Sequence, residues 1–345
     1  GAHPAVDYED MFLSEGTYPT GSMNDYFQEV SHGAFSVDGA VTDWTTATST
    51  YMSYSIGDTV QDAGTCRNMI IDAVAQLDPF IDYSLFDNDG PDGIPDSGDD
   101  DGYVDALFFI HSGSGEESSG DPRDIWSHAW GFYNSGGLPT NDGVGIRRYS
   151  VEPEEFPDGE MITVGVFAHE YGHVLGLPDL YDTDYSSNGI GEWGLMSGGS
   201  WTHRDADAAG SSPSHMTAWS KIRLGWVTPT LVTGDLLGVS IPPAETNAVA
   251  YRMFREGAAT GDEYYLIENR RTIGFDEGLL RRQYYFGLAA PEGLIIYHVD
   301  DSLSGNSNEA HRLVDVEDAS PWYDSVSGEW HETLDQRRDY DTWHL

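Results

Sequence analysis

The stretch HEYGHVLGLPD at residues 169–179 restricts the fold of this chain more than any other segment. His169 and His173 are four positions apart, and an α-helix makes one turn in about 3.6 residues, so both side chains project from one helical face. Two imidazoles in this arrangement can hold one metal ion, with Glu170 beside it. The segment therefore predicts a helix built around a metal site.

The ends of that helix are also encoded in the sequence. We expect a helix over residues 164–177, with the hydroxyl of Thr163 capping its first turn. Gly176 favours termination of the helix, and Pro178 prevents its continuation. The chain must then turn, which brings Asp179 back toward the two histidines.

These residue types fit a catalytic zinc site. Zinc in such sites takes three protein ligands and keeps a fourth position for water, whose pKa falls to about 7. The expected ligands are His169, His173 and Asp179. Glu170 is then free to accept a proton from the attacking water and to pass it to the leaving amine of a peptide.

A glycine-rich segment follows, GEWGLMSGGSW at residues 191–201. It places Met196 where metzincin-type enzymes have a methionine beneath the metal, although a methionine there could equally fill the core. Glu192 lies near enough in sequence to compete with Asp179 as the third ligand. The sequence favours Asp179 because the end of the helix directs it toward the ion.

Charge limits the partners of this chain. It has 59 acidic and 16 basic residues in 345, for a formal net charge of -43, and Lys221 is its only lysine. Such a surface repels nucleic acid and anionic membranes, so we expect neither as a partner. Bound cations or high salt would relieve the repulsion, and the composition suits a saline or calcium-rich medium.

Targeting signals and disulfides are not evident in the sequence. No segment reaches the roughly 20 apolar residues that span a bilayer. The N-terminal GAHPAVDYED lacks the features of a signal peptide, so we expect a mature or trimmed chain. The single cysteine, Cys66, excludes an intrachain disulfide and is typical of a small buried side chain.

An aspartate-rich segment, DNDGPDGIPDSGDDDGYVD at residues 87–105, is a candidate calcium loop. Calcium takes six to eight oxygen ligands from flexible loops, although Pro91 does not fit an EF-hand and a solvated acidic loop would look similar. The candidate ligands are Asp87, Asp89, Asp92, Asp96, Asp99, Asp101 and Asp105. Asp182 and Asp184, just after the metal motif, could bind a second calcium ion.

The remaining pattern indicates an α/β (α+β) protein with two parts. Helices are expected at residues 23–30, 64–77 and 214–224, and a buried strand is expected at 106–111, followed by a glycine-rich loop. Beyond about residue 230, short alternating segments such as YYLIENR and GLIIYHVD indicate strands. We predict a catalytic domain over residues 1–228 and a β-rich C-terminal portion over 229–345 packed on it.

Several of these motifs together resemble one protein family. HEYGHVLGLPDLYDTD, GLMSGGSW, SHMTAWSKIRLGWV, LIENRRTIGFD and GLIIYHVDDS are similar in order and spacing to the immune inhibitor A family of secreted bacterial metallopeptidases. The resemblance implies a zincin-like catalytic domain and an extracellular zinc endopeptidase in which calcium ions support the catalytic domain. It implies His169 and His173 as zinc ligands and Glu170 as the catalytic acid and base.

The resemblance also bears on the precursor. Family members usually carry a propeptide and an opening strand ahead of the point where this sequence begins, so we expect a propeptide partner in the precursor. Protein or peptide substrates are the expected partners of the active chain.

Two features would complete a peptidase site. A transition-state oxyanion needs a donor besides the metal, and Tyr185 or His203 could supply it. An extended substrate often adds to the edge of a sheet, and residues 106–115 are a candidate edge strand.

Two other functions remain open from the sequence. One is a calcium-stabilised extracellular binding or adhesion protein with a vestigial zinc site, which the presence of Glu170 disfavours. The other is a zinc hydrolase that acts on a bond other than a peptide. The metal-helix motif is mostly a peptidase feature and so favours peptide hydrolysis.

Overall fold

The structure is a computed structural model that describes residues 3–55, 62–90, 92–133, 136–254, 260–280, 292–317, 322–324 and 329–331. It contains both helices and sheets, which confirms the predicted α+β class. The chain divides into two compact units, residues 1–10 with 39–162 and residues 11–38 with 163–345. These units use different segments from the predicted domains 1–228 and 229–345, a division that stays a prediction.

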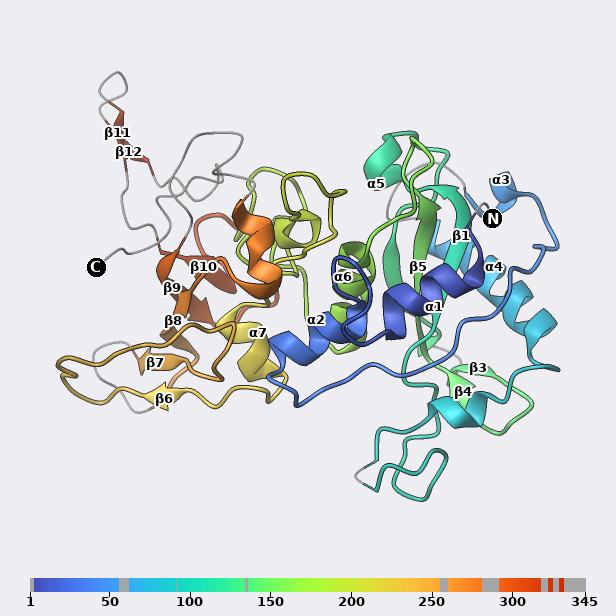
Figure 1. Cartoon of the computed structure of the whole chain (residues 1–345), viewed down its shortest axis with the longest axis horizontal. Helices are drawn as coiled ribbons and strands as arrows, with labels where there is room; N and C mark the ends of the chain where they lie inside the picture. The colour runs from blue at the N-terminus through green and yellow to red at the C-terminus, as the bar shows by residue number, and fades with distance from the viewer. Residues whose placement is uncertain are drawn as a thin grey trace. The chain divides into compact units, whose positions relative to one another are not determined.

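The first unit is built on a three-stranded sheet in the order β1, β5, β2 (Figure 1). β1 (Phe108–Ser114) pairs in parallel with β5 (Arg148–Glu155), and β2 (His128–Gly131) pairs antiparallel with the other side of β5. Within the described strands, β1 therefore lies at an edge, as expected. A short antiparallel ribbon of β3 (Leu138–Pro139) and β4 (Gly145–Ile146) completes its strands in the described residues.

The core of the first unit forms between its longest helix and this sheet. Its helices are α3 (Tyr51–Tyr54), α4 (Asp62–Leu77), η1 (Tyr83–Phe86) and α5 (Glu116–Ser119). Cys66, Ile70 and Val74 recur every four positions along α4 and are buried with Tyr149 and Val151 of β5. Cys66 is a free, buried thiol, as the sequence predicted.

The acidic segment belongs to the first unit as well. Residues 87–105 contain no helix or strand among their described residues and extend as an irregular teal loop away from the sheet (Figure 1).

The second unit contains several helices in its described residues, one of which carries the metal motif. They are α2 (Met23–Val30), α6 (Val164–Val174), η3 (Gly198–Trp201), α7 (Ala218–Arg223) and η5 (Gly274–Leu280), while α1 (Ala5–Leu13) contains the first division point between the units. α2 packs on α6 through the edge-to-face rings of Phe27 and Tyr171, whose centroids are 5.2 Å apart. Phe12 packs in the same way on Phe167, at 4.7 Å.

The second unit also carries the predicted β-rich region. Five strands lie in the order β10, β9, β8, β7, β6, and a separate hairpin pairs β11 with β12. The strands are β6 (Thr230–Leu231), β7 (Tyr251–Phe254), β8 (Glu263–Arg270), β9 (Gly293–Asp300), β10 (Val314–Val316), β11 (Trp322–Asp324) and β12 (Glu329–His331). Burial alternates along β8, as the alternating sequence predicted.

Several details of the predicted elements were wrong. The helix expected over residues 164–177 ends at Val174. The strand expected at residues 106–111 continues to Ser114, because the pairing with β5 resumes there after an irregularity in register. The hydroxyl of Thr163 does not cap α6; it donates to the carbonyl of Ala209 at 2.6 Å. The hydroxyl of Thr163 therefore hydrogen-bonds a residue distant in sequence and not the first turn of the helix.

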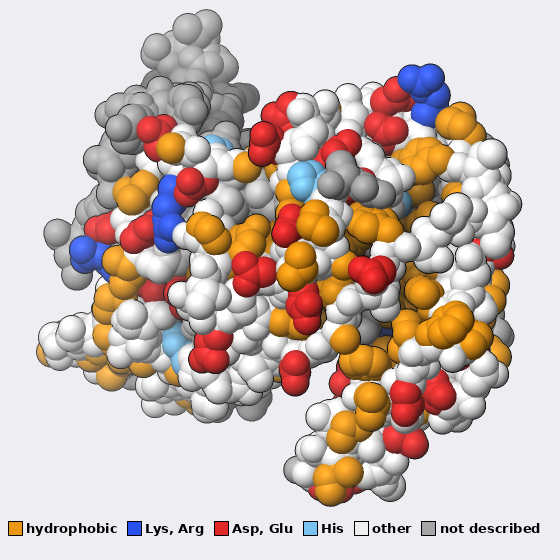
Figure 2. All heavy atoms as spheres, turned by 45° about the vertical axis from the view of Figure 1, so that its right-hand side comes forward, with side chains coloured by type: hydrophobic (Ala, Val, Ile, Leu, Met, Phe, Trp, Pro, Cys, Tyr) orange, Lys and Arg blue, Asp and Glu red, His pale blue; other side chains and the backbone are white. Residues whose placement is uncertain are grey.

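The surface reflects the composition. Acidic side chains are spread over the face drawn in Figure 2, where lysine and arginine side chains occur in only a few places. Among the described residues, no helix combines the length and the apolar character needed to cross a membrane.

Candidate metal centre

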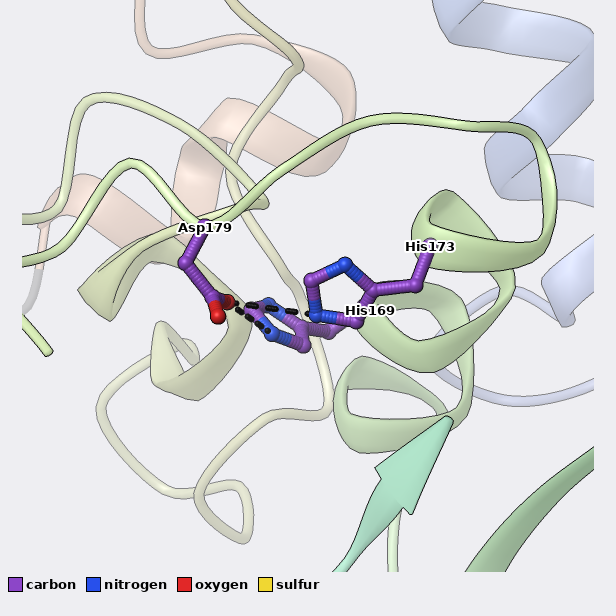
Figure 3. A group of neighbouring side chains, drawn as sticks. All are labelled: His169, His173 and Asp179. Carbon is purple, nitrogen blue, oxygen red and sulfur yellow. Dashed lines mark ion pairs between the residues drawn. The ribbon is translucent and has the colours of Figure 1, made fainter. Parts of the chain in front are cut away.

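Helix α6 positions the two histidines of the motif. Their imidazole rings are 4.9 Å apart, centroid to centroid, and nearly perpendicular. His169 is 8% exposed and is thus buried, while His173 is partly exposed. The four-residue spacing has the predicted effect, because both rings face the same space at the end of the helix (Figure 3).

The turn after α6 directs the third side chain toward this space. Gly176 adopts φ of 93°, a left-handed conformation that glycine reaches without strain. Its amide donates to His173 O at 3.0 Å, and the amide of Leu177 donates to Gly172 O at 3.0 Å. These are the two hydrogen bonds of a Schellman motif, which ends the helix and sends the chain back.

Asp179 then faces both histidines (Figure 3). Its Oδ1 lies 3.2 Å from His169 Nε2 and 3.2 Å from His173 Nε2. A tetrahedral zinc ion with bonds of about 2.1 Å holds its ligand atoms about 3.4 Å apart. The spacing and the donor set of two imidazoles and one carboxylate therefore fit zinc.

The outer nitrogen of each imidazole is fixed by a backbone carbonyl. His169 Nδ1 lies 2.9 Å from Leu195 O, and His173 Nδ1 lies 2.9 Å from Leu177 O. If each Nδ1 carries the proton, each Nε2 has its lone pair directed at the shared space. Such outer hydrogen bonds orient metal-binding histidines.

His173 and Asp179 influence each other's protonation. Burial disfavours the charged ring of His173, but the adjacent Asp179 carboxylate outweighs this effect and raises the pKa of His173 to about 9. Burial alone would raise the pKa of Asp179, but the two adjacent histidines hold it below its ordinary value. A divalent cation bound here would replace a proton.

Glu170 and Met196 lie close to the histidines. Glu170 is 5% exposed, and its carboxylate is near enough to favour the charged form of His173. Met196 is fully buried, and its sulfur occupies the space where a Cβ on Gly172 would stand. The glycine at this position allows the methionine to approach the helix directly before His173.

The other candidates are arranged differently. Glu192 is buried but does not belong to the group formed by the two histidines and Asp179. The ring nitrogen Nδ1 of His203 lies 2.8 Å from Arg204 O. Tyr185 is 70% exposed and stacks on Tyr181 at 6.4 Å, centroid to centroid.

Tyr181 is a residue of the site that sequence reasoning missed. Its ring stacks on His169 at 6.2 Å, centroid to centroid. Burial and the nearby Asp179 carboxylate raise the pKa of its hydroxyl. Its position two residues after Asp179 is the one signal that could have identified it.

Three of the seven candidate aspartates in the acidic loop come together. One carboxylate oxygen from each of Asp87, Asp89 and Asp105 lies within 4.8 Å of the others. Asp87 is fully buried, and neither of its oxygens has a hydrogen-bond partner among the residues that the structure describes. The pKa of Asp87 is raised to about 6, mainly by burial and in addition by the negative charge of Asp100 and other nearby aspartates.

The remaining four candidates lie outside this group: Asp92, Asp96, Asp99 and Asp101. Asp99 instead accepts hydrogen bonds within the loop, including one from the amide of Asp92 at 3.2 Å.

A second acidic group contains Asp182 and Asp184 with Glu309. Unlike Asp87, Asp182 accepts several hydrogen bonds, including one from the amide of Ser187 at 3.0 Å. Glu309 is far away in the sequence, so only the fold could reveal it.

Comparison with known proteins agrees with this geometry. A sequence model described as "Immune inhibitor A peptidase M6, catalytic domain" matches residues 4–227. Immune inhibitor A of Bacillus thuringiensis subsp. alesti is 33% identical over 246 residues, which is 62% of this chain and 33% of that protein. Pre-pro-metalloprotease PrtV of Vibrio cholerae serotype O1 (strain M66-2) is 32% identical over 241 residues, 62% of this chain and 25% of that protein. The matched part thus spans a third or less of these curated relatives.

Proposed function

The chain belongs to the immune inhibitor A family of M6 metallopeptidases, and from this membership we propose that it is a zinc-dependent endopeptidase. The observation that carries the proposal is the convergence of His169 Nε2, His173 Nε2 and Asp179 Oδ1 within one ligand-sized space. These three atoms would hold the zinc ion. When bound, zinc supplies a Lewis acid that lowers the pKa of water to about 7.

Different residues of the chain would then have different roles in peptide hydrolysis. Glu170 accepts the proton of the attacking water on its carboxylate and delivers it to the leaving amine nitrogen. Its buried position beside His169 keeps this carboxylate away from bulk water. The carbonyls of Leu195 and Leu177 hold the imidazoles in place during the reaction.

We also propose that calcium supports the fold. The support comes from Asp87, which meets Asp89 and Asp105. Its carboxylate is buried and has no hydrogen-bond partner in the described part of the chain. One oxygen atom from each of these three residues, together with water or backbone carbonyls, would match the oxygen ligands that calcium prefers. Asp182 and Asp184, now joined by Glu309, are the proposed second calcium site.

The setting of the enzyme completes the proposal. Residues 1–228 would form the catalytic domain, and residues 229–345 would form its β-rich partner. The enzyme would be made with a propeptide, would act outside the cell and would cleave proteins or peptides. The net charge of -43 disfavours nucleic acid as a partner, and we propose no membrane insertion.

A peptide library tests the function directly. The zinc-loaded chain is incubated with mixed peptides, with and without a zinc chelator, and products are read by mass spectrometry. We expect cleavage within the peptides that the chelator stops. A zinc-loaded chain that cleaves nothing would overturn the proposal and would favour a binding protein with a vestigial site.

Glu170→Gln tests the proposed acid and base. The amide cannot accept the proton, so we expect zinc content to stay unchanged while kcat falls roughly 10² to 10⁴-fold. Glu192→Gln is the matched control, because this glutamate is similarly buried, at 6% against 5% exposed. Full activity in Glu170→Gln would remove Glu170 from this role.

The same control variant separates the two candidates for the third ligand. Asp179→Asn should weaken zinc binding, measured by competition with a chromogenic chelator, whereas Glu192→Gln should not. The reverse result would make Glu192 the ligand.

A further inference from the structure

A short loop beneath the metal helix sets the orientation of His169. This loop, residues 193–196, provides the Leu195 carbonyl that lies 2.9 Å from His169 Nδ1. It also provides Met196, which packs against α6 at Gly172. A shift of this loop would therefore turn the imidazole and move its Nε2 atom away from the other two proposed ligands.

The loop is held from the C-terminal sheet. Arg270, the last residue of β8, donates from Nη1 to the carbonyl of Trp193 at 3.2 Å. The neighbouring carbonyl of Glu192 accepts a hydrogen bond from Ser214 Oγ at 2.7 Å. Two side chains thus fix the start of the loop, and one of them lies beyond residue 227, where the match to the catalytic domain ends.

Arg270 is itself held rigidly. Its side chain is fully buried, and its Nε and Nη2 each donate to a different oxygen of Asp276 at 2.7 Å. Glu268 lies 3.2 Å from Nη1, and Glu245 lies 3.3 Å from Nε. A planar guanidinium fixed by a two-point carboxylate contact has little freedom, so the direction of its remaining N–H groups is determined.

The cluster around Arg270 contains three buried carboxylates and the buried amine of Lys221. Its buried carboxylates are Asp276, Glu268 and Glu245, and each favours the charged guanidinium. Removing one partner of such a buried group strongly destabilises the fold, because it leaves a buried charge without its counter-charge. The buried partners therefore hold the guanidinium of Arg270 in one orientation.

We propose that Arg270 is a positioning residue for the metal centre, acting through the 193–196 loop on the orientation of His169. The inference rests on the proposed zinc site and extends it to a residue outside the matched catalytic domain. Arg270 touches neither the ion nor the substrate in this role. It fixes the Trp193 carbonyl, and the loop carries that constraint two residues further to the Leu195 carbonyl.

The test compares Arg270→Lys with Tyr297→Phe. Lysine keeps the positive charge but cannot reach Asp276 and Trp193 together. Tyr297 belongs to the same cluster, because its hydroxyl donates to Glu268 at 2.7 Å, but this hydrogen bond is not made to the loop. Both variants should unfold at lower urea concentration than the wild type.

Only Arg270→Lys should change the metal centre. We expect its zinc Kd to rise about tenfold, the lower end of the effect of losing an outer partner of a ligand. We also expect the visible absorption bands of the cobalt-substituted protein to shift, and kcat to fall with little change in KM. Unchanged zinc affinity and cobalt bands in folded Arg270→Lys would overturn the proposal.

Ser214→Ala keeps the test decisive if Arg270→Lys does not fold. It removes the side-chain hydrogen bond to the carbonyl of Glu192, directly before the loop, and does not change a residue of the ionic cluster. Shifted cobalt bands in this variant would support the loop as the link, and unchanged bands would overturn it. A wild-type chain that binds neither zinc nor cobalt would instead refute the proposed function itself, and the role of Arg270 with it.

Discussion

Gly172 shows how a single missing side chain shapes the metal centre. It precedes His173 on α6, and the sulfur of Met196 fills the space beside it. Glycine inside a helix usually costs about 1 kcal/mol relative to alanine. The chain accepts that cost where a methionine must approach the helix closely.

Gly172→Ala should therefore destabilise the protein, although alanine is the better helix former. We expect a loss of about 1–3 kcal/mol in the free energy of unfolding, because a buried side chain must move to make room. Urea unfolding of the metal-free protein measures it. In a Met196→Ala background the same substitution should be neutral or stabilising, and an equal loss in both backgrounds would contradict the explanation.

Individual residues of the site could be predicted from the sequence where the constraint is local. His169 and His173 follow from helical spacing, and the approach of Asp179 follows from Gly176 and Pro178. The cap assigned to Thr163 failed because Ala209 competes for its hydroxyl. The metal-ligand set of His169, His173 and Asp179 stays a prediction.

At the scale of elements, the acidic loop links proton binding to calcium binding. Without calcium, burial and neighbouring aspartates raise the pKa of Asp87 to about 6. Because the folded state binds this proton more tightly than the unfolded state, the protein becomes less stable as pH rises from the ordinary pKa, near 3.8, to the raised pKa of Asp87. Calcium binds the deprotonated group, so it should restore more stability at higher pH.

The stabilisation by calcium should therefore grow with pH. We expect the difference in Tm between calcium-loaded and calcium-chelated protein to increase from pH 5 to pH 7.5, at fixed zinc concentration. Asp87→Asn should reduce this difference, while Asp96→Asn, in the same loop but outside the group, should leave it unchanged. A difference in Tm that is independent of pH would argue against Asp87 as a ligand.

Helices and strands were predictable where one period dominates the sequence. The expected helices at 23–30, 64–77 and 214–224 correspond to α2, α4 and α7, and the alternating segments correspond to β8 and β9. The end of β1 could not be predicted, because its glycines and serines carry no apolar alternation and pairing with β5 extends the strand. Tertiary partners decide such boundaries.

At the scale of the whole molecule, charge repulsion opposes folding. The formal net charge is -43, and the sequence pI is about 4.1. Screening shortens the reach of these charges from about 10 Å at 0.1 M salt to about 3 Å at 1 M. Salt should therefore favour the compact state at neutral pH.

The Tm at pH 7 should accordingly rise between 0.05 M and 1 M sodium chloride, as measured by calorimetry on metal-saturated protein. Near pH 4 the net charge is close to zero, and there the same salt should have little effect. A fall in Tm with salt at pH 7 would mean that attractive ion pairs outweigh the general repulsion.

Contacts between distant segments lay beyond the reach of sequence reasoning. Glu309 joins Asp182 and Asp184, and Arg270 meets Trp193, only because the chain returns to the metal helix from its C-terminal half. No local period encodes either contact.

The one lysine of the chain, Lys221, lies in α7 of the second unit and is buried. Lys221 is 1% exposed, and its Nζ lies 3.1 Å from His215 Nδ1. In the folded chain, amine-reactive reagents such as succinimidyl esters and aldehyde fixatives therefore cannot reach a side-chain primary amine. A dye attached at Lys221 therefore identifies a molecule that has unfolded at least locally, so labelling of this lysine reports unfolding.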